Sequence, residues 1–216
     1  MKLNPRKLAA VAISAVLLCQ PLFAFQIPLS ENAVREAYFL GQRNDQKTAD
    51  LFKLYTVSLP LPNKGPHVSE IRLLTPYAQV VSNSAQHSVG YSAQQAAADY
   101  HGRGDTILVQ VHIEFTVTFN YEDAVRLAAD TAGELNRHLD PEDFWRGFLY
   151  DVRQDEKSLQ PSNVFADPIY SDGLLRGTVV SLEYDATRFQ SQPAQVQVTN
   201  PTGQKVAADF DLEKLL

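Results

Sequence analysis

The sequence predicts a β-rich α+β fold, an antiparallel sandwich or half-barrel that is partly covered by several short helices. Three observations lead to this fold class. Residues 107–119 alternate apolar and polar side chains over 13 positions, which is the pattern of a strand with one buried and one wet face. A turn at 200–203 separates two shorter alternating segments. Other segments, such as 122–135, instead repeat their apolar residues at helical spacing.

The segment 25–58 is predicted to be largely helical. Ser30 is a good N-cap residue, and Glu31 follows in the first turn, where the helix dipole favours a carboxylate. Apolar residues recur at helical spacing up to residue 43, and a second short helix is expected over 48–55. A cluster of prolines and glycine over 60–66 then marks the clearest break in the chain.

After this break, short strands are expected over 68–74 and 77–81, on either side of Thr75-Pro76, and a short helix over 91–100. The strongest strand signal follows. Its predicted buried face consists of Ile107, Val109, Val111, Ile113, Phe115, Val117 and Phe119. β-branched and aromatic residues dominate this face, which favours a strand.

The second half of the chain is predicted to contain a helix over 122–135 and then mainly strands. The segment 144–152 is predicted as a strand, with a short amphipathic helix as the alternative. A further strand is expected over 178–184. Near the end, Asn200-Pro201-Thr202-Gly203 forms the turn of a hairpin, since proline suits the second position of a turn and glycine accepts a positive φ.

The first 24 residues are predicted to be an export signal. The segment opens with a positive region formed by Lys2, Arg6 and Lys7. An unbroken run of apolar and small residues covers 8–19, and Pro21 ends it. Ala24 offers a small residue for cleavage before Phe25. This pattern predicts an exported protein, either periplasmic or secreted.

Three alternatives to a cleaved signal were weighed. A permanent membrane anchor needs about 20 apolar residues, whereas this run has 12. A lipoprotein would be cut before Cys19, but Leu18 is bulky for that position. A buried first helix is disfavoured because no acidic residue precedes Glu31. The expected organisation is therefore a signal over 1–24 and a single exported β-rich domain over 25–216.

Composition narrows the possible functions of the mature chain. Removal of the signal leaves 16 basic and 25 acidic residues, a net charge of −9. This charge disfavours nucleic acid and anionic membrane surfaces as partners, because both are bound by clustered lysine and arginine. The one cysteine lies in the signal, so disulfides and cysteine-based metal or catalytic sites are excluded from the mature chain.

His112 and Glu114 are the first weak candidates for a binding surface. Both lie on the predicted wet face of the long strand, where they suit a metal site or a general-base pair. The simpler interpretation is a solvated polar face, because alternation alone places polar residues at these positions.

Four neighbouring residues are the other candidates: Asp140, Glu142, Asp143 and Trp145. A cluster of carboxylates suits calcium, or a sugar held beside an aromatic ring. One short cluster supplies too few oxygens for calcium, however. The simpler interpretation is a helix start, with Asp140 as the N-cap, Pro141 in the first position and two acids in the first turn.

No motif for a catalytic residue, cofactor or metal is found in the sequence, and none is predicted. The leading hypothesis is a non-catalytic binding or assembly module of the bacterial cell envelope, with a protein or glycan partner. If the strand over 107–119 lies at the edge of its sheet, a strand of the partner would pair with it there. One alternative is an exported hydrolase that acts on glycans or peptides with carboxylates as acid and base. A second is a carrier of a small apolar ligand, which requires a cavity inside the sheet.

Overall fold

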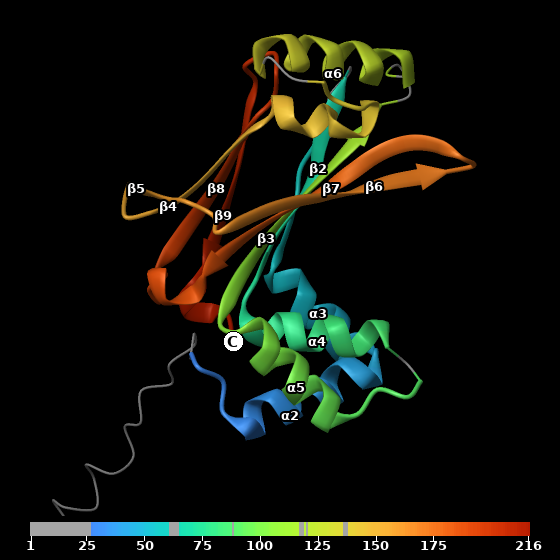
Figure 1. The fold of residues 1–216 in the computed structure, drawn as a ribbon. Coiled ribbons are helices and arrows are strands. Elements are labelled where there is room, and N and C mark those ends of the chain that lie inside the picture. Colours follow the sequence, from blue (N-terminus) through green and yellow to red (C-terminus); the bar gives the residue numbers. More distant parts are fainter. Residues whose placement is uncertain (1–26, 61–64, 88, 117–118, 120, 136–137) are drawn as a thin grey trace, which may run out of the picture.

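The computed structural model describes residues 27–60, 65–87, 89–116, 119, 121–135 and 138–216. Two antiparallel sheets form its centre, and they do not close into a barrel. One group of helices gathers at one end of the sheets: α2 (Glu31–Arg43), α3 (Gln46–Leu54), α4 (Pro76–Gln86) and α5 (Ala93–Arg103). Helix α6 (Tyr121–Leu135) and the short helix η2 (Pro141–Gly147) cover the opposite end (Figure 1). The predicted β-rich α+β class is confirmed.

The first sheet has the strand order β1-β2-β3-β7-β6. Its strands are β1 (Thr56–Ser58), β2 (Pro66–Leu74), β3 (Thr106–Phe115), β6 (Asn163–Ser171) and β7 (Leu174–Asp185). β3 pairs with β2 on one side and with β7 on the other, where Ile107 lies opposite Tyr184 and Glu114 opposite Gly177. The predicted long strand is therefore a central strand that ends at Phe115, and the rest of its predicted extent falls partly outside the described residues.

The central position of β3 corrects one expectation. A partner strand cannot add to β3, because both of its hydrogen-bonding sides are occupied within the sheet. The alternation of the sequence reports which side chains are buried, and it carries no information about which neighbours a strand has.

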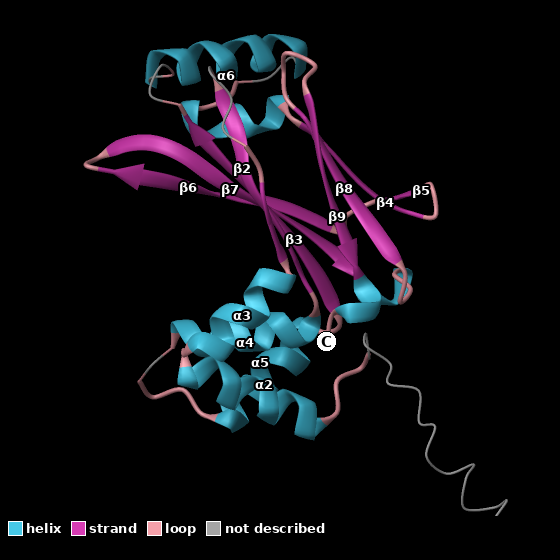
Figure 2. Ribbon diagram, turned by 180° about the vertical axis from the view of Figure 1, so that it is seen from behind, coloured by secondary structure: helices cyan, strands magenta, loops and turns pink. Residues whose placement is uncertain are grey.

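The second sheet has the order β5-β4-β8-β9. Its strands are β4 (Leu149–Gln154), β5 (Lys157–Leu159), β8 (Pro193–Thr199) and β9 (Lys205–Asp211). The predicted hairpin over β8 and β9 is confirmed, and Gly203 has the positive φ of 85° that its turn requires. Figure 2 shows this sheet lying beside the first, with the two inner faces toward each other.

The main apolar core fills the space between the two sheets. Val111 and Ile113 of β3 belong to the same buried cluster as Val152 of β4 and Val196 of β8, and none of the four is exposed. The buried face of β3 thus packs against side chains of the second sheet. A smaller cluster holds α2, α4 and α5 together and includes Val34, Val81 and Tyr100.

The first helices follow the predicted start signals. Ser30 caps α2, and its hydroxyl accepts a hydrogen bond from the backbone N–H of Ala33. Asp45 caps α3, so this helix begins two residues before the predicted 48–55.

The strand expected over 77–81 is wrong, because this segment lies inside α4. Thr75 is the N-cap of that helix, with its hydroxyl accepting from the N–H of Ala78, and Pro76 occupies the first turn. A threonine followed by proline is itself a helix-start signal. The two apolar residues Ala78 and Val81 are three positions apart and share the buried side of the helix.

The strand expected over 144–152 is wrong in its first part. Residues 141–147 form the 3-10 helix η2, and β4 begins only at Leu149. Asp140 has the extended backbone of an N-cap and Pro141 follows it, as the helix-start interpretation predicts. Proline after an N-cap favours a helical turn over a strand at this position.

The predicted signal segment, with Ala24 and Phe25, lies outside the described residues. Among the residues that the structure describes, no helix is long and apolar enough to cross a membrane.

Candidate functional site

His112 and Glu114 lie on the outer face of the first sheet, where they join a row of polar side chains from β2 and β3. Arg72 Nε is 2.5 Å from Glu70 Oε1, and His112 Nε2 is 3.8 Å from the same oxygen. The hydroxyl of Ser69 donates to Glu114 Oε1 at 2.9 Å. The two candidates are therefore side chains of one polar face and do not contact each other as an acid–base pair.

The environment of His112 favours a neutral ring. Burial is the largest effect that lowers its pKa below the ordinary 6.5, and the nearby guanidinium of Arg72 lowers it further. The carboxylates Glu70 and Glu114 act in the opposite direction. Among the described residues there is no group of three or more potential metal ligands.

His67 lies on the same outer face, opposite Glu114, and it is almost fully buried. Burial also lowers the pKa of this imidazole. We therefore predict that acid weakens the fold. As the pH falls below 6.5, the unfolded histidines take up protons before the folded ones do, so the free energy of unfolding decreases until the folded pKa is reached.

Urea unfolding measured as a function of pH tests this prediction. The His67→Gln variant should lose part of the decline below the ordinary histidine pKa, because glutamine takes up no proton. The matched substitution His101→Gln, at an exposed helix position, should leave the decline as it is. An identical decline in all three proteins would refute the assignment.

A polar cleft of about 380 Å³ lies beside this face, between the sheet and helices α4 and α5. Arg72, Gln110 and His112 come from the sheet, and Asn83, Gln86 and Arg103 come from the helices. The sequence analysis singled out only His112 among these residues. The others gave no local signal, since they come together only when α4 and α5 fold back onto the sheet.

The second set of candidates forms a different surface, on η2. The carboxylate of Asp143 contacts Arg146 Nε at 2.8 Å, and the guanidinium of Arg146 lies over the ring of Trp145 at 4.3 Å from its centre. Trp145 is only 7% exposed. Its ring therefore belongs to the packing beneath η2 and does not offer an open platform for a sugar. Asp140 makes no side-chain cap bond, and its carboxylate lies 3.7 Å from His138.

A groove of about 340 Å³ separates η2 from β6. Asp140, Glu142 and Asp143 line one side, and Ala166 and Pro168 are among the residues on the other side. The hydroxyl of Tyr170 on β6 donates a short hydrogen bond to Glu142, and this bond raises the pKa of Tyr170. The four acidic and aromatic candidates thus lie together at this groove, whereas His112 and Glu114 belong to a different surface.

Strand β6 borders both the polar cleft and the groove, and it was not expected from the sequence. It is the last strand of its sheet and pairs only with β7 among the described residues. A signal for it existed. Asp172-Gly173, both with positive φ, is a tight hairpin turn directly before β7. The segment that precedes such a turn is a strand, and Pro168 within it indicates an edge strand.

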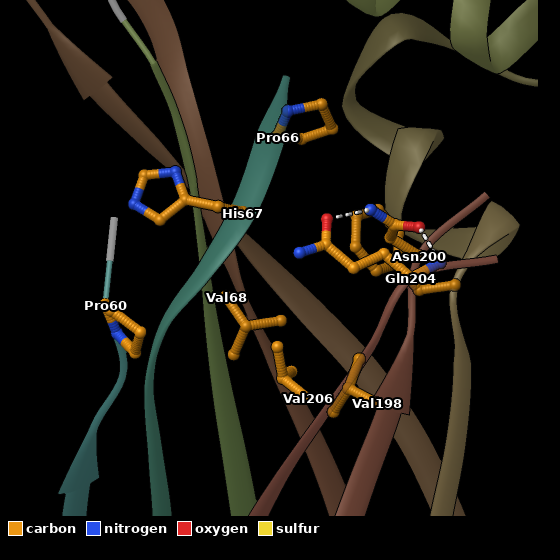
Figure 3. A pocket seen from close by; sticks show the side chains of 9 residues that line it. Pro60, Pro66, His67, Val68, Val198, Asn200, Gln204 and Val206 are labelled. Carbon is orange, nitrogen blue, oxygen red and sulfur yellow. Dashed lines mark hydrogen bonds between the residues drawn. The ribbon is translucent and has the colours of Figure 1, made fainter. Parts of the chain in front are cut away.

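The cavity beside the main core is small. A partly open pocket of about 30 Å³ lies between β2 and the β8–β9 hairpin. Figure 3 shows Val68, Val198 and Val206 directed toward one another there, while the ring of His67 lies on the other side of β2. This volume suits one water molecule. It is too small for an apolar ligand of the kind that a carrier protein encloses.

Comparison of the chain with protein-family models, with curated proteins and with solved structures finds no match.

Proposed function

We propose that this protein is an exported, non-catalytic binding module of the cell envelope that takes up an extended segment of a partner protein along the free edge of β6. The observation that carries the proposal is the position of this edge. It lies directly beside the groove that the acidic helix η2 lines. A free edge supplies main-chain hydrogen bonds, and an adjacent groove supplies specificity for side chains.

The other sheet edges are better protected than β6. β1 and β5 have three residues each, and β9 carries the charged residues Lys205, Asp209 and Asp211 along its seven. Short length and charge are the usual devices that keep edge strands from pairing with another chain. β6 has nine residues and carries the exposed apolar side chains of Val164 and Phe165.

Pro168 indicates which backbone groups of β6 face outward. Proline has no N–H, so an edge strand tolerates it where the nitrogen points away from the neighbouring strand. Ala166 and Val164 lie two and four residues before it, respectively, on the same side of the alternation. We therefore expect their N–H and C=O groups to point to the free edge, ready to pair with a partner.

The charge of the groove favours a basic partner. Asp143 is already paired with Arg146. The side chain of Asp140 is 77% exposed and lies 3.7 Å from His138, and among the described residues Glu142 is engaged by the neutral hydroxyl of Tyr170. Lysine or arginine side chains of the added strand would reach these two carboxylates. Opposite charges attract one another more strongly in a partly covered groove than on an open surface.

A nine-residue peptide of alternating lysine and valine, which matches the length of β6, is expected to bind saturably. The Ala166→Pro variant should weaken this binding about tenfold or more, since one main-chain hydrogen bond is lost and the pyrrolidine ring blocks the edge. Its thermal unfolding midpoint should stay near that of the unaltered protein, because no bond to β7 is removed. Fluorescence anisotropy of a labelled peptide measures the affinity.

Charge substitutions separate the edge from the groove. Asp140→Asn should weaken binding of the lysine–valine peptide, whereas the same change at Asp209, on the edge of the other sheet, should leave that binding unchanged. An alternating glutamate–valine peptide should bind far less well than the basic one. The proposal fails if both peptides bind equally or if Ala166→Pro binds the basic peptide as the unaltered protein does.

A further inference from the structure

We propose that the polar cleft between α4, α5 and the outer face of the first sheet binds a small organic anion through a carboxylate or phosphate group. The cleft shares Asp167 with β6, but the inference does not depend on the proposed strand addition. Figure 2 shows helices α4 and α5 packed at the end of the sheet where the cleft lies. The cleft has a volume of about 380 Å³, which lies within the usual range for small-molecule sites.

The first guanidinium of the cleft is held in place from the sheet. Glu70 approaches Arg72 at Nε, with 2.5 Å between the atoms. A contact at Nε leaves the two terminal nitrogens of a guanidinium for another partner, and these bind a carboxylate or phosphate in a bidentate manner. Arg72 is 40% exposed on its side chain, so such a partner can reach it from solvent.

The second guanidinium is held in place from the helices. The side-chain oxygen of Gln79 accepts from Arg103 Nη1 at 3.2 Å. Gln79 is buried, and its amide nitrogen donates to the carbonyl oxygens of Leu74 and Thr106. These bonds hold the Gln79 side chain in place, and its oxygen, which also accepts from the hydroxyl of Thr106, is one fixed partner for Arg103. A guanidinium that is fixed before the ligand arrives loses little conformational entropy on binding.

The remaining lining supplies further hydrogen-bond donors. Gln86 and Gln110 present side-chain amides; that of Gln86 donates to Ser82 Oγ at 3.4 Å, and Gln110 forms no side-chain hydrogen bond with another described residue. Among the described residues that line the cleft, Asp167 of β6 carries the one carboxylate. Carboxylate and phosphate oxygens are acceptors. A ligand of this class would therefore satisfy donors from both walls at once.

The charges around the cleft are mixed. Arg72 and Arg103 carry two positive charges, Glu70 and Asp167 carry two negative ones, and Asp99 of α5 lies near Arg103. Glu70 is already engaged at the Nε side of its arginine. Asp167 is exposed on β6, where it is free to accept from a hydroxyl of the ligand. The site thus fits an anion that also carries hydroxyl groups.

An NMR titration of the mature chain with three probes tests the proposal: inorganic phosphate, citrate and glucuronate, with glucose as the uncharged match of glucuronate. At least one of the three anions should shift the side-chain amide signals of Gln86 and Gln110 saturably, and glucose should not. Arg72→Gln and Arg103→Gln should each weaken the binding about tenfold or more, as expected for loss of charged hydrogen bonds.

Two comparisons complete the test. Arg188→Gln removes an arginine elsewhere on the surface, whose Nη1 donates to the carbonyl of Gln160, and it should leave anion binding unchanged. The Asp140→Asn variant, which alters the groove beside β6 but no residue that lines the cleft, should also bind the anion normally, which separates failure of this site from failure of the β6 edge. The proposal is overturned if none of the three anions binds saturably, if glucose binds as well as glucuronate, or if both arginine variants retain full affinity.

Discussion

The Gly41→Ala variant is expected to be about 2–3 kcal/mol less stable than the unaltered protein. Gly41 lies where α2 crosses α4. A β-carbon added there would lie 2.3 Å from the backbone oxygen of Val81 and 2.7 Å from the β-carbon of Ser84. The first atom belongs to a helix backbone and cannot move alone, so the two helices must separate. Helix propensity favours alanine by about 1 kcal/mol, and steric overlap outweighs it.

Gly102→Ala is the matched control for this prediction. Gly102 is also helical, in α5 of the same group of helices, and a β-carbon there meets nothing within 4 Å. The same substitution should therefore raise or preserve stability. For a chain of this size, 1 kcal/mol corresponds to about 2–4 °C in the unfolding midpoint, so thermal unfolding resolves the two variants. Equal midpoints would contradict the close helix crossing.

The Phe144→Ala variant should lose about 3–5 kcal/mol of stability, the usual loss when a buried phenylalanine is truncated. Phe144 is fully buried, and its ring lies 4.9 Å from that of Phe115 and 6.5 Å from that of Phe148. These contacts anchor η2 to the core. Because η2 forms one wall of the acidic groove, we expect the variant to bind the lysine–valine peptide more weakly even at temperatures where most of the chain remains folded.

Two substitutions give the scale for this effect. Phe144→Leu keeps most of the buried volume and should cost less than half as much. Phe39→Ala removes an aromatic ring that is 51% exposed on α2, and should change stability by less than about 1 kcal/mol. Chemical unfolding followed by circular dichroism measures all three variants. A loss at Phe39 equal to that at Phe144 would contradict the anchoring role.

The parts of the fold that the sequence predicts well are those with a buried face or a local cap. β3 follows from its alternation, because one face contacts the core along its whole length. α2 follows from Ser30, whose side chain bonds within its own first turn. In α4 the same kind of cap is present at Thr75, but the short apolar run after it also fits the strand that the sequence predicts. Short runs do not separate the two periods.

The sequence of β6 does not alternate, so the pattern that predicts β3 could not predict this strand. Most of its side chains are exposed, so no buried face imposes a period of two. Its apolar residues come as neighbours, Val164 with Phe165 and Ile169 with Tyr170. The residues of the polar cleft are likewise only partly predictable from the sequence. Polar positions such as His112 are predictable from the pattern of their own strand, whereas the cleft requires Arg72 and Arg103 to meet through a crossover of two helices.

The position of β6 between the two concave surfaces limits how this strand can change in length during evolution. Asp167 lines the polar cleft, while its neighbours Ala166 and Pro168 line the acidic groove. Insertion or deletion of one residue between Pro168 and the turn at Asp172-Gly173, which fixes the register with β7, would exchange these roles, placing a carboxylate in the groove and an apolar side chain in the cleft. Insertions or deletions of two residues would preserve both surfaces. Related chains that keep both surfaces should therefore differ in this strand by even numbers of residues.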